Sequence, residues 1–238
     1  MKMKKWLMMM LLLVPLTGYA EQPAQPAEEI ITQSGQKIAI ANLGDNRFKI
    51  GQIVLDKTAR SFEVPGKFLR TEPPIEFLAV AKKGHRGYES LLEFDANVYE
   101  FNLACILIGL DTHKGLPPKA HFDPTPVVGD AVEIGLQWEV KGQKYEHLAS
   151  DFFLVNNQKL KSGNWVYTGS TFLPKGGYLA EAAGGTLVGF VHDPASIIEH
   201  GQGFGPQSYS QLELNKLLMP AVDTPLKATF TYLGNTQK

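Results

Sequence analysis

The sequence has little of the sulfur chemistry on which redox and cluster proteins depend. Its single cysteine, Cys105, excludes an intramolecular disulfide and an iron–sulfur cluster held by cysteines alone. Cys105 lies in the apolar segment 103–108 with no cationic neighbour, so we expect a buried and unreactive thiol. The sequence therefore disfavours any function that works through sulfur.

Recognisable metal motifs are also missing. The six histidines are not organised by a His-Glu-x-x-His pattern, a paired-cysteine pattern or a calcium loop. The densest group of potential ligands is His113 and His121 with Asp111 and Asp123, in a proline-rich loop where such residues more often form a solvated surface. We therefore expect no metal site and no cofactor.

The chain has no excess of positive charge and no hydrophobic run of membrane-spanning length. It contains 23 basic and 24 acidic residues, which excludes the basic composition of a typical nucleic-acid-binding protein. Its apolar run over residues 6–14 is about half of the ~20 residues that a membrane-spanning helix needs. We expect no nucleic-acid partner and, once the leader is removed, no membrane span.

The first 20 residues have the layout of a secretory signal peptide. A basic start precedes the apolar run, and Gly18 and Ala20 occupy the two positions before the cut that require small side chains. No cysteine stands at the cut site to carry a lipid. Removing Lys2, Lys4 and Lys5 leaves 20 basic against 24 acidic residues. We therefore expect an acidic protein that is periplasmic or secreted.

After the leader, the sequence predicts a linker and then one β-rich domain. Residues 21–44 favour a flexible linker, since 21–37 mix Pro, Ala, Gln and Glu with little periodicity. Residues 45–238 form the expected domain. Short segments rich in β-branched and aromatic residues, which alternate with turn signals, predict strands. A turn over 56–59 separates the first two, and Pro65-Gly66 ends the second. The expected strands are 48–55, 60–64, 75–81, 132–141 and 224–233.

Helical patterns are fewer. One main helix is expected over 96–108, where apolar residues recur at three- and four-residue spacing and Asp95 can cap the start. Shorter helices are expected to begin at Asp193 and Ser210. Together these patterns predict an α+β fold, in which a β-rich single domain of mostly antiparallel strands packs with one main helix and a few short helices.

Several motifs in this order resemble those of one bacterial family. They are Ile75-Glu76-Phe77-Leu78, the segment 84–92 with Glu89-Ser90, the segment 104–110, Trp138 in its alternating strand, the segment 165–170 and Thr224-Pro225-Leu226-Lys227. Together they resemble the YdjY family of exported bacterial proteins over about residues 45–235. In that family a histidine usually precedes Glu-Ser, whereas Tyr88 stands there in this chain. The resemblance implies export but no particular activity.

Two of these segments hold the candidate ligand-binding side chains. Segment 84–92 places polar groups between two glycines and an apolar pair, and segment 165–170 places two aromatic rings before a hydroxyl. The alternatives are a tight turn in which Glu89 satisfies backbone donors, and a strand whose aromatic rings belong to the core. The candidates are His85, Tyr88, Glu89, Ser90, Trp165, Tyr167 and Ser170.

No arrangement of residues in the sequence identifies a catalytic site. It has no Gly-x-Ser-x-Gly elbow, no phosphate-binding loop and no redox pair. We therefore expect a non-catalytic binding or interaction module of the bacterial envelope, whose partner is a small molecule or an envelope protein. One alternative is an envelope hydrolase with Ser90 or Ser170 as nucleophile and His85 or His192 as base. Another is an accessory subunit of an envelope assembly.

The leader gives a direct prediction. When the full chain is expressed in a bacterium, mass spectrometry should find an exported protein that begins at Glu21. Ala20→Arg should block the cut, because this position must be small, and the uncut chain should accumulate. Gln25→Arg, beyond the cut, is the matched control and should be processed normally. Export of an uncut wild-type chain would contradict the prediction.

Overall fold

The computed structural model describes residues 28–31, 35, 37–160 and 164–235. The expected signal peptide, residues 1–20, lies outside the described residues. The strands are β1 Glu28–Ile31, β2 Lys37–Gly44, β3 Arg47–Ile50, β4 Ile53–Asp56, β5 Ser61–Phe68, β6 Phe77–Ala81, β7 Ser90–Phe94, β8 Asp130–Val140, β9 Gln143–Leu148, β10 Phe153–Val155, β11 Gln158–Lys159, β12 Trp165–Tyr167, β13 Thr186–Gly189, β14 Ile198–His200, β15 Leu212–Leu214 and β16 Pro225–Asn235. The helices are α1 Val98–Leu107, α2 Leu179–Ala182 and α3 Pro206–Tyr209, with short 3-10 turns η1 His85–Glu89, η2 Thr112–Lys114 and η3 Ala149–Phe152.

Eight of the strands close into a ring. Hydrogen bonding runs in the order β5-β16-β8-β12-β14-β13-β6-β7, and β7 pairs again with β5. The pairs β6–β7 and β13–β14 are parallel, while the other ring pairs are antiparallel. The expected α+β class is therefore wrong. The fold is β-rich, as expected, but its sheet closes on itself with mixed pairing instead of lying open against a helix.

Ring closure depends on β5, which shares one of its edges between two strands. Residues 61–63 pair with β4 and residues 66–68 pair with β7, while β16 occupies the opposite edge. The change of partner falls at Pro65-Gly66. Pro65 has no N–H to donate, and its carbonyl oxygen accepts the N–H of Asp95 at 2.8 Å. The sequence predicted that Pro65-Gly66 ends a strand, but β5 continues through it and changes neighbours there.

Gly66 makes this closure sterically possible. A Cβ atom built on Gly66 would overlap the carbonyl oxygen of Glu93 on β7 and would crowd the ring of Phe94. The backbone of β7 leaves no room to relieve such an overlap without separating β5 from β7. Only glycine therefore allows the two strands to pair at this point.

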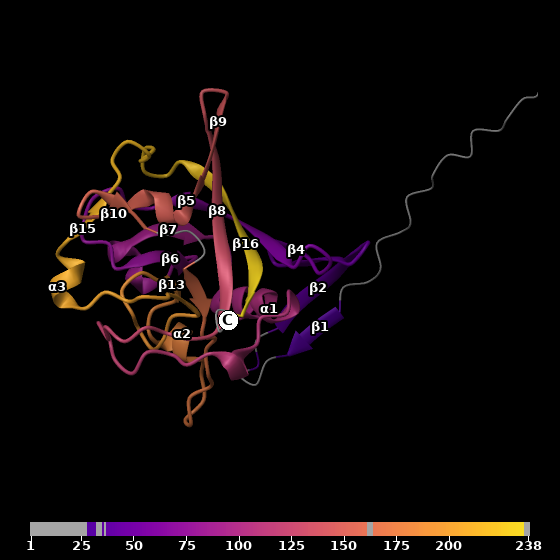
Figure 1. Cartoon of the computed structure of the whole chain (residues 1–238). Helices are drawn as coiled ribbons and strands as arrows, with labels where there is room; N and C mark the ends of the chain where they lie inside the picture. The colour runs from indigo at the N-terminus through magenta and orange to yellow at the C-terminus, as the bar shows by residue number, and fades with distance from the viewer. Residues whose placement is uncertain (1–27, 32–34, 36, 161–163, 236–238) are drawn as a thin grey trace, which may run out of the picture.

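The helix α1 covers one end of the ring, next to the lower ends of β8 and β16 in Figure 1. The side chain of Asn97 accepts the N–H groups of Tyr99 and Glu100, and the Glu100 carboxylate accepts the N–H of Asn97 in return. The helix therefore begins with Asn97 as its cap, two residues after the expected cap, Asp95. Its residue Phe101 packs against Phe62, Phe94 and Phe230, which come from three ring strands.

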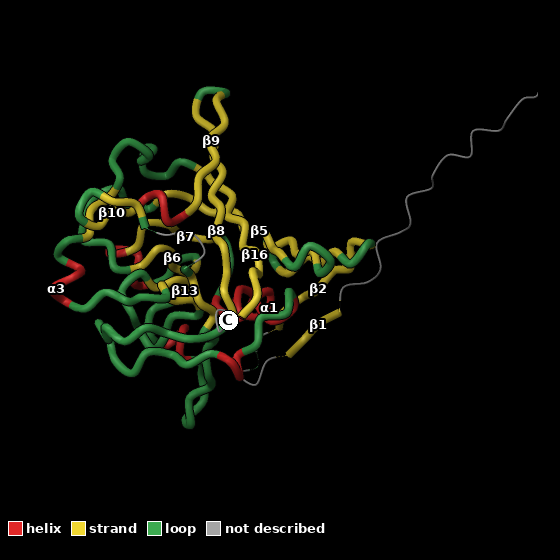
Figure 2. Tube along the Cα trace, in the orientation of Figure 1, coloured by secondary structure: helices red, strands yellow, loops and turns green. Residues whose placement is uncertain are grey.

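Two parts of the sheet extend beyond the ring. Strands β1 to β4 form an antiparallel meander on the free half of β5, and β8 with β9 forms a long hairpin that projects from the body (Figures 1 and 2). A separate three-stranded sheet has the order β11-β10-β15. Within the segment 21–44, expected as a linker, the described residues form the strands β1 and β2, apart from residue 35.

Three local expectations differ from the structure. The segment 48–55 forms two strands, β3 and β4, because a turn at Gly51 separates them. The helix expected from Ser210 is replaced by β15, whose residues pair with β10. At Asp193 the structure has a turn, in which the Asp193 side chain accepts the N–H of Ala195 without starting a helix.

The steric role of Gly66 predicts a large effect of one methyl group. Gly66→Ala should destabilise the protein by about 1–3 kcal/mol or more, because overpacking a tight backbone contact costs this much. Gly135→Ala is the matched control, since Gly135 also lies in a ring strand and a Cβ there meets nothing within 4 Å. Urea unfolding followed by circular dichroism measures both. Equal stability of the two variants would contradict the role given to Gly66.

The ring interior also holds a buried histidine. The ring of His200 lies among Trp165, Phe190 and Phe204, at centroid distances of 5.3, 5.3 and 5.2 Å. Burial, assisted by the charge of the nearby His192, lowers the pKa of His200 to about 3. Because the pKa of an unperturbed histidine is 6.5, the unfolded chain takes up a proton over a pH range in which the folded chain does not.

This difference predicts a pH dependence of stability. The contribution of neutral His200 is fully present above about pH 6.5 and is lost as the pH falls toward 3, with a slope of at most ~1.4 kcal/mol per pH unit. His200→Leu removes this titratable group and should therefore flatten the decline in the free energy of unfolding between pH 6.5 and 4. His85→Gln, which changes an exposed imidazole, is the control and should keep the wild-type slope. An unchanged slope in His200→Leu would contradict the prediction.

Candidate functional site

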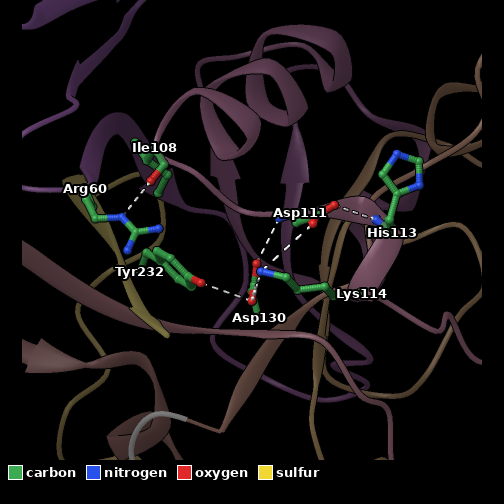
Figure 3. Close-up of polar contacts among 7 residues, drawn as sticks. All are labelled: Arg60, Ile108, Asp111, His113, Lys114, Asp130 and Tyr232. Atoms are coloured by element: carbon green, nitrogen blue, oxygen red, sulfur yellow. Dashed lines mark hydrogen bonds and ion pairs between the residues drawn. The ribbon is translucent and has the colours of Figure 1, made fainter. Parts of the chain in front are cut away.

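Polar side chains gather at both ends of the ring. At the α1 end, Asp130 begins β8 and is fully buried. One of its carboxylate oxygens accepts the N–H of Asp111 at 2.9 Å, and the other accepts the hydroxyl of Tyr232 at 3.1 Å and lies 3.5 Å from Lys114 Nζ (Figure 3). The charge of Asp130 is thus surrounded by donors from three parts of the chain.

Arg60 extends this cluster toward the helix. Its guanidinium group lies 3.7 Å from the ring centroid of Tyr232, and its Nε donates to the carbonyl oxygen of Ile108 at 3.3 Å (Figure 3). His113 joins only through its backbone N–H, which donates to the Asp111 side chain, and its imidazole points away from Asp130. We assign this cluster a structural role, because its buried carboxylate is already satisfied by the protein.

A second cluster lies at the opposite end of the ring. We call it the His121 site, and it consists of Glu76, Arg86, Glu89, His121 and Asp193. The imidazole of His121 has a carboxylate on each nitrogen, with Nε2 3.1 Å from Glu76 Oε2 and Nδ1 3.2 Å from Asp193 Oδ2. The His121 side chain is 37% exposed, whereas those of Glu76 and Asp193 are 16% and 10% exposed. The two carboxylates are thus largely buried, whereas solvent reaches the imidazole of His121 between them.

The ring strands fix the position of Glu76. It directly precedes β6, and its N–H donates to the carbonyl oxygen of Glu89 at 2.8 Å. Its own carbonyl oxygen accepts the N–H groups of Phe190 and Val191, which follow β13. Because α1 follows directly from the end of β7, the residues that precede the parallel strands β6 and β7 lie at the far end from α1. Glu76 and Glu89 therefore meet there.

Asp193 is held by both its backbone and its side chain. Its Oδ1 accepts the N–H of Ala195 at 2.9 Å, which leaves Oδ2 directed at His121. Its N–H donates at 3.0 Å to Glu199 Oε1 on β14. Burial raises the pKa of Glu199 well above its usual value, and the negative charge of Asp193 raises it further. Glu199 thus holds the backbone of Asp193 from behind the site.

His121 comes from the long connection between η2 and β8. This connection is tied to the ring where the N–H of Phe122 donates to the carbonyl oxygen of His192 at 2.9 Å. The ring of Phe122 packs at 5.5 Å against that of Tyr209 on α3. Burial, and the nearby charge of Glu76, raise the pKa of Tyr209 to about 12, so its hydroxyl stays neutral beside the site.

The His121 site has more negative than positive groups. Arg86 is its permanent cation, and it is already ion-paired with Glu89. Burial raises the pKa of Glu76, and the charge of Glu89 raises it further. A neutral imidazole carries one N–H and can donate to only one of its two neighbouring carboxylates. The arrangement can therefore accommodate one further hydrogen-bond donor, supplied by a bound cationic group.

The structure does not bring the seven candidate residues together. Trp165 and Tyr167 on β12 are buried in the core, and three ring strands, β14, β13 and β6, separate β12 from Ser90 on β7. Ser170 lies beyond the end of β12, where its hydroxyl accepts the N–H of Ala180 in α2. Ser90 is fully buried and donates to the carbonyl oxygen of Arg86. Their common role in ligand binding stays a prediction.

Three of the candidates come from η1. Glu89 belongs to the His121 site, whereas His85 and Tyr88 are exposed beside it, with Tyr88 59% exposed. The group of His113 and His121 is divided, since these histidines use the different partners described above. Among the described residues, no three His, Cys, Asp or Glu side chains are arranged to hold a metal ion.

Sequence reasoning did not single out Glu76 or Asp193 as site residues. Glu76 was visible as a charged residue at the start of a buried strand, and Asp193 as a capping residue before a proline. His121 was noted only as a potential metal ligand. No local signal connects the three, because β6, the η2–β8 connection and the turn after β13 meet only in the folded ring.

Comparisons with known proteins place the chain in one family. No curated protein and no solved structure matches the chain significantly. In the described part of the chain, helices long and apolar enough to cross a membrane are absent. The YdjY domain matches residues 53–231, which include all eight strands of the ring up to Thr231 of β16 and every residue of the His121 site. This chain therefore belongs to the YdjY family.

Proposed function

We propose that the protein is a non-catalytic binding module of the bacterial envelope, and that its His121 site binds a cationic group of a small molecule. The observation that carries the proposal is the imidazole of His121 between Glu76 and Asp193. The envelope location rests on the signal-peptide pattern of residues 1–20.

The charge distribution supports a cationic ligand. Glu76, Glu89 and Asp193 supply three carboxylates against one permanent cation, Arg86. An ammonium or guanidinium group that displaces or supplements the imidazole would satisfy the carboxylate that a neutral ring leaves without a donor. Hydrogen bonds between charged partners in such a half-buried place are stronger than those between neutral groups. The exposed edge of His121 gives such a group access from solvent.

The geometry supports binding over the hydrolase alternative. Ser90 donates to a backbone carbonyl and Ser170 accepts a backbone N–H, so in the described residues neither hydroxyl is paired with a histidine. His192 is buried, and its Nε2 lies 2.6 Å from the carbonyl oxygen of His200. His121, the solvent-accessible histidine of the site, has a carboxylate at each nitrogen. His85 is exposed on η1 and, among the described residues, has no hydrogen bond to either serine. A nucleophile with its base is therefore not assembled.

Ligand-induced stabilisation tests the proposal. Agmatine, which carries a guanidinium and an ammonium group, should raise the Tm of the mature protein at pH 7.5, because a ligand at 100 times its Kd stabilises by about 2.7 kcal/mol. Glu76→Gln and Asp193→Asn keep the shapes of the side chains but remove their charges, and each should abolish most of the shift. Glu63→Gln, on an exposed carboxylate of β5, should retain it.

Two further compounds make the test selective. Putrescine, a diamine, should also raise the Tm, whereas the anion glutarate should not. The absence of any shift with both cations would overturn the cationic ligand, and so would shifts that are equal in the wild type and in Glu76→Gln.

A further inference from the structure

The second strand of the projecting hairpin, β9, is an open edge of the sheet. Among the described strands β9 pairs only with β8. The projecting part of this hairpin, which we call the arm, consists of β9 and the paired residues 135–140 of β8, and it stands clear of the body in Figures 1 and 2. A groove of about 590 Å³ runs along the arm and is lined in part by Trp138, Glu139, Lys144, Tyr145 and Glu146. Such an edge carries backbone donors and acceptors that another strand can pair with.

The turn of the hairpin determines which backbone groups of β9 are free. Lys141 and Gly142 both have positive φ, +51° and +81°, as a two-residue type I′ turn requires. Val140 and Gln143 flank this turn and form the first hydrogen-bonded pair. From there the backbone groups alternate, so those of Tyr145 point to β8. The N–H and C=O groups of Lys144 and Glu146 point outward.

The two side chains at these positions have opposite charges. Lys144 and Glu146 are both exposed, and they lie on the solvent face of the hairpin. Tyr145 lies on the other face, where its ring stacks on Trp138 at 5.3 Å with an interplanar angle of 8°. The ring stack joins the two strands of the arm on that face, and the free edge carries one cation and one anion two residues apart.

We propose that two copies of this chain pair through β9, antiparallel about a two-fold axis at Tyr145. In this register Lys144 faces Glu146 of the second copy, and Glu146 faces Lys144 of the second copy. At each of these two pairs the strands exchange backbone hydrogen bonds. Tyr145 lies directly opposite Tyr145 of the second copy, at the position between the two charge pairs and on the other face of the sheet. Because the same patch serves both copies, the interface is closed and symmetric.

Charge also selects this register among the possible ones. Moving the axis by one residue toward the turn would place Lys144 opposite Lys144 of the second copy. Moving it one residue the other way would place Glu146 opposite Glu146 of the second copy. Like charges directly opposite each other on neighbouring strands are destabilising. The axis at Tyr145 is the one at which both outward residues meet an opposite charge.

Charge reversal tests the interface in the mature protein. Sedimentation velocity over a concentration series should show a monomer–dimer equilibrium for the wild type. Lys144→Glu and Glu146→Lys should each weaken dimerisation at least ~10-fold, because two attractive cross-strand pairs become repulsive. The double variant Lys144→Glu/Glu146→Lys should restore it to within about threefold of the wild type, since the pairs are only exchanged.

Mixing provides a second readout that does not depend on any one variant. An equimolar mixture of the two single variants should form a mixed dimer. In it, the two glutamates of the Lys144→Glu variant face the two lysines of the Glu146→Lys variant. Lys49→Glu, an exposed lysine on β3, makes the same change of charge away from the arm and should dimerise like the wild type. Circular dichroism melting curves establish that every variant is folded.

Three outcomes would overturn the proposal. One is a wild-type protein that stays monomeric at the highest concentration, as it would if β9 instead accepts a strand from a different protein. Another is a dimer that Lys144→Glu does not weaken. The third is a double variant, or a mixture of the single variants, that fails to recover dimerisation.

Discussion

The contact between β5 and β7 is the constraint on which the rest of the fold depends. It joins the first and last strands of the ring, and it exists because Gly66 has no side chain to keep the backbone of β7 away. Closure gives the ring two ends. One end is filled by Phe101 of α1, and the connections at the other bring Glu76, Glu89 and Asp193 together. A sheet left open at β5 would separate these groups.

Local pattern was enough to predict single elements but not their closure. The alternation over 132–141 predicted β8, and the helical spacing over 96–108 predicted α1, because each pattern is set by one face of one element. Closure depends on partners far apart in the chain, so Pro65-Gly66 resembled a strand end. Likewise, the expected helix at Ser210 gave way to β15, since pairing with β10 outweighs local helix preference.

The candidate site was recoverable only in part for a related reason. Glu89 was identified from its segment, and it lies in the His121 site. The aromatic residues Trp165 and Tyr167 were expected either in a cleft or in the core, and their near-complete burial places them in the core. Whether an aromatic or acidic side chain faces solvent depends on which strands pack over it. That information is not carried by the neighbouring residues in the chain.

Ring closure also limits how this protein can associate in an uncontrolled way. The large sheet has few strands with an open side in the described chain, and besides β9 its hydrogen-bonded path ends at β1. That strand is fully exposed and carries Glu28 and Glu29 in succession. Two such edges would bring acidic side chains against each other, which opposes growth of long strand-to-strand filaments. Ring closure thus leaves few strand edges in the large sheet, and the acidic residues of β1 disfavour pairing between copies at one of them.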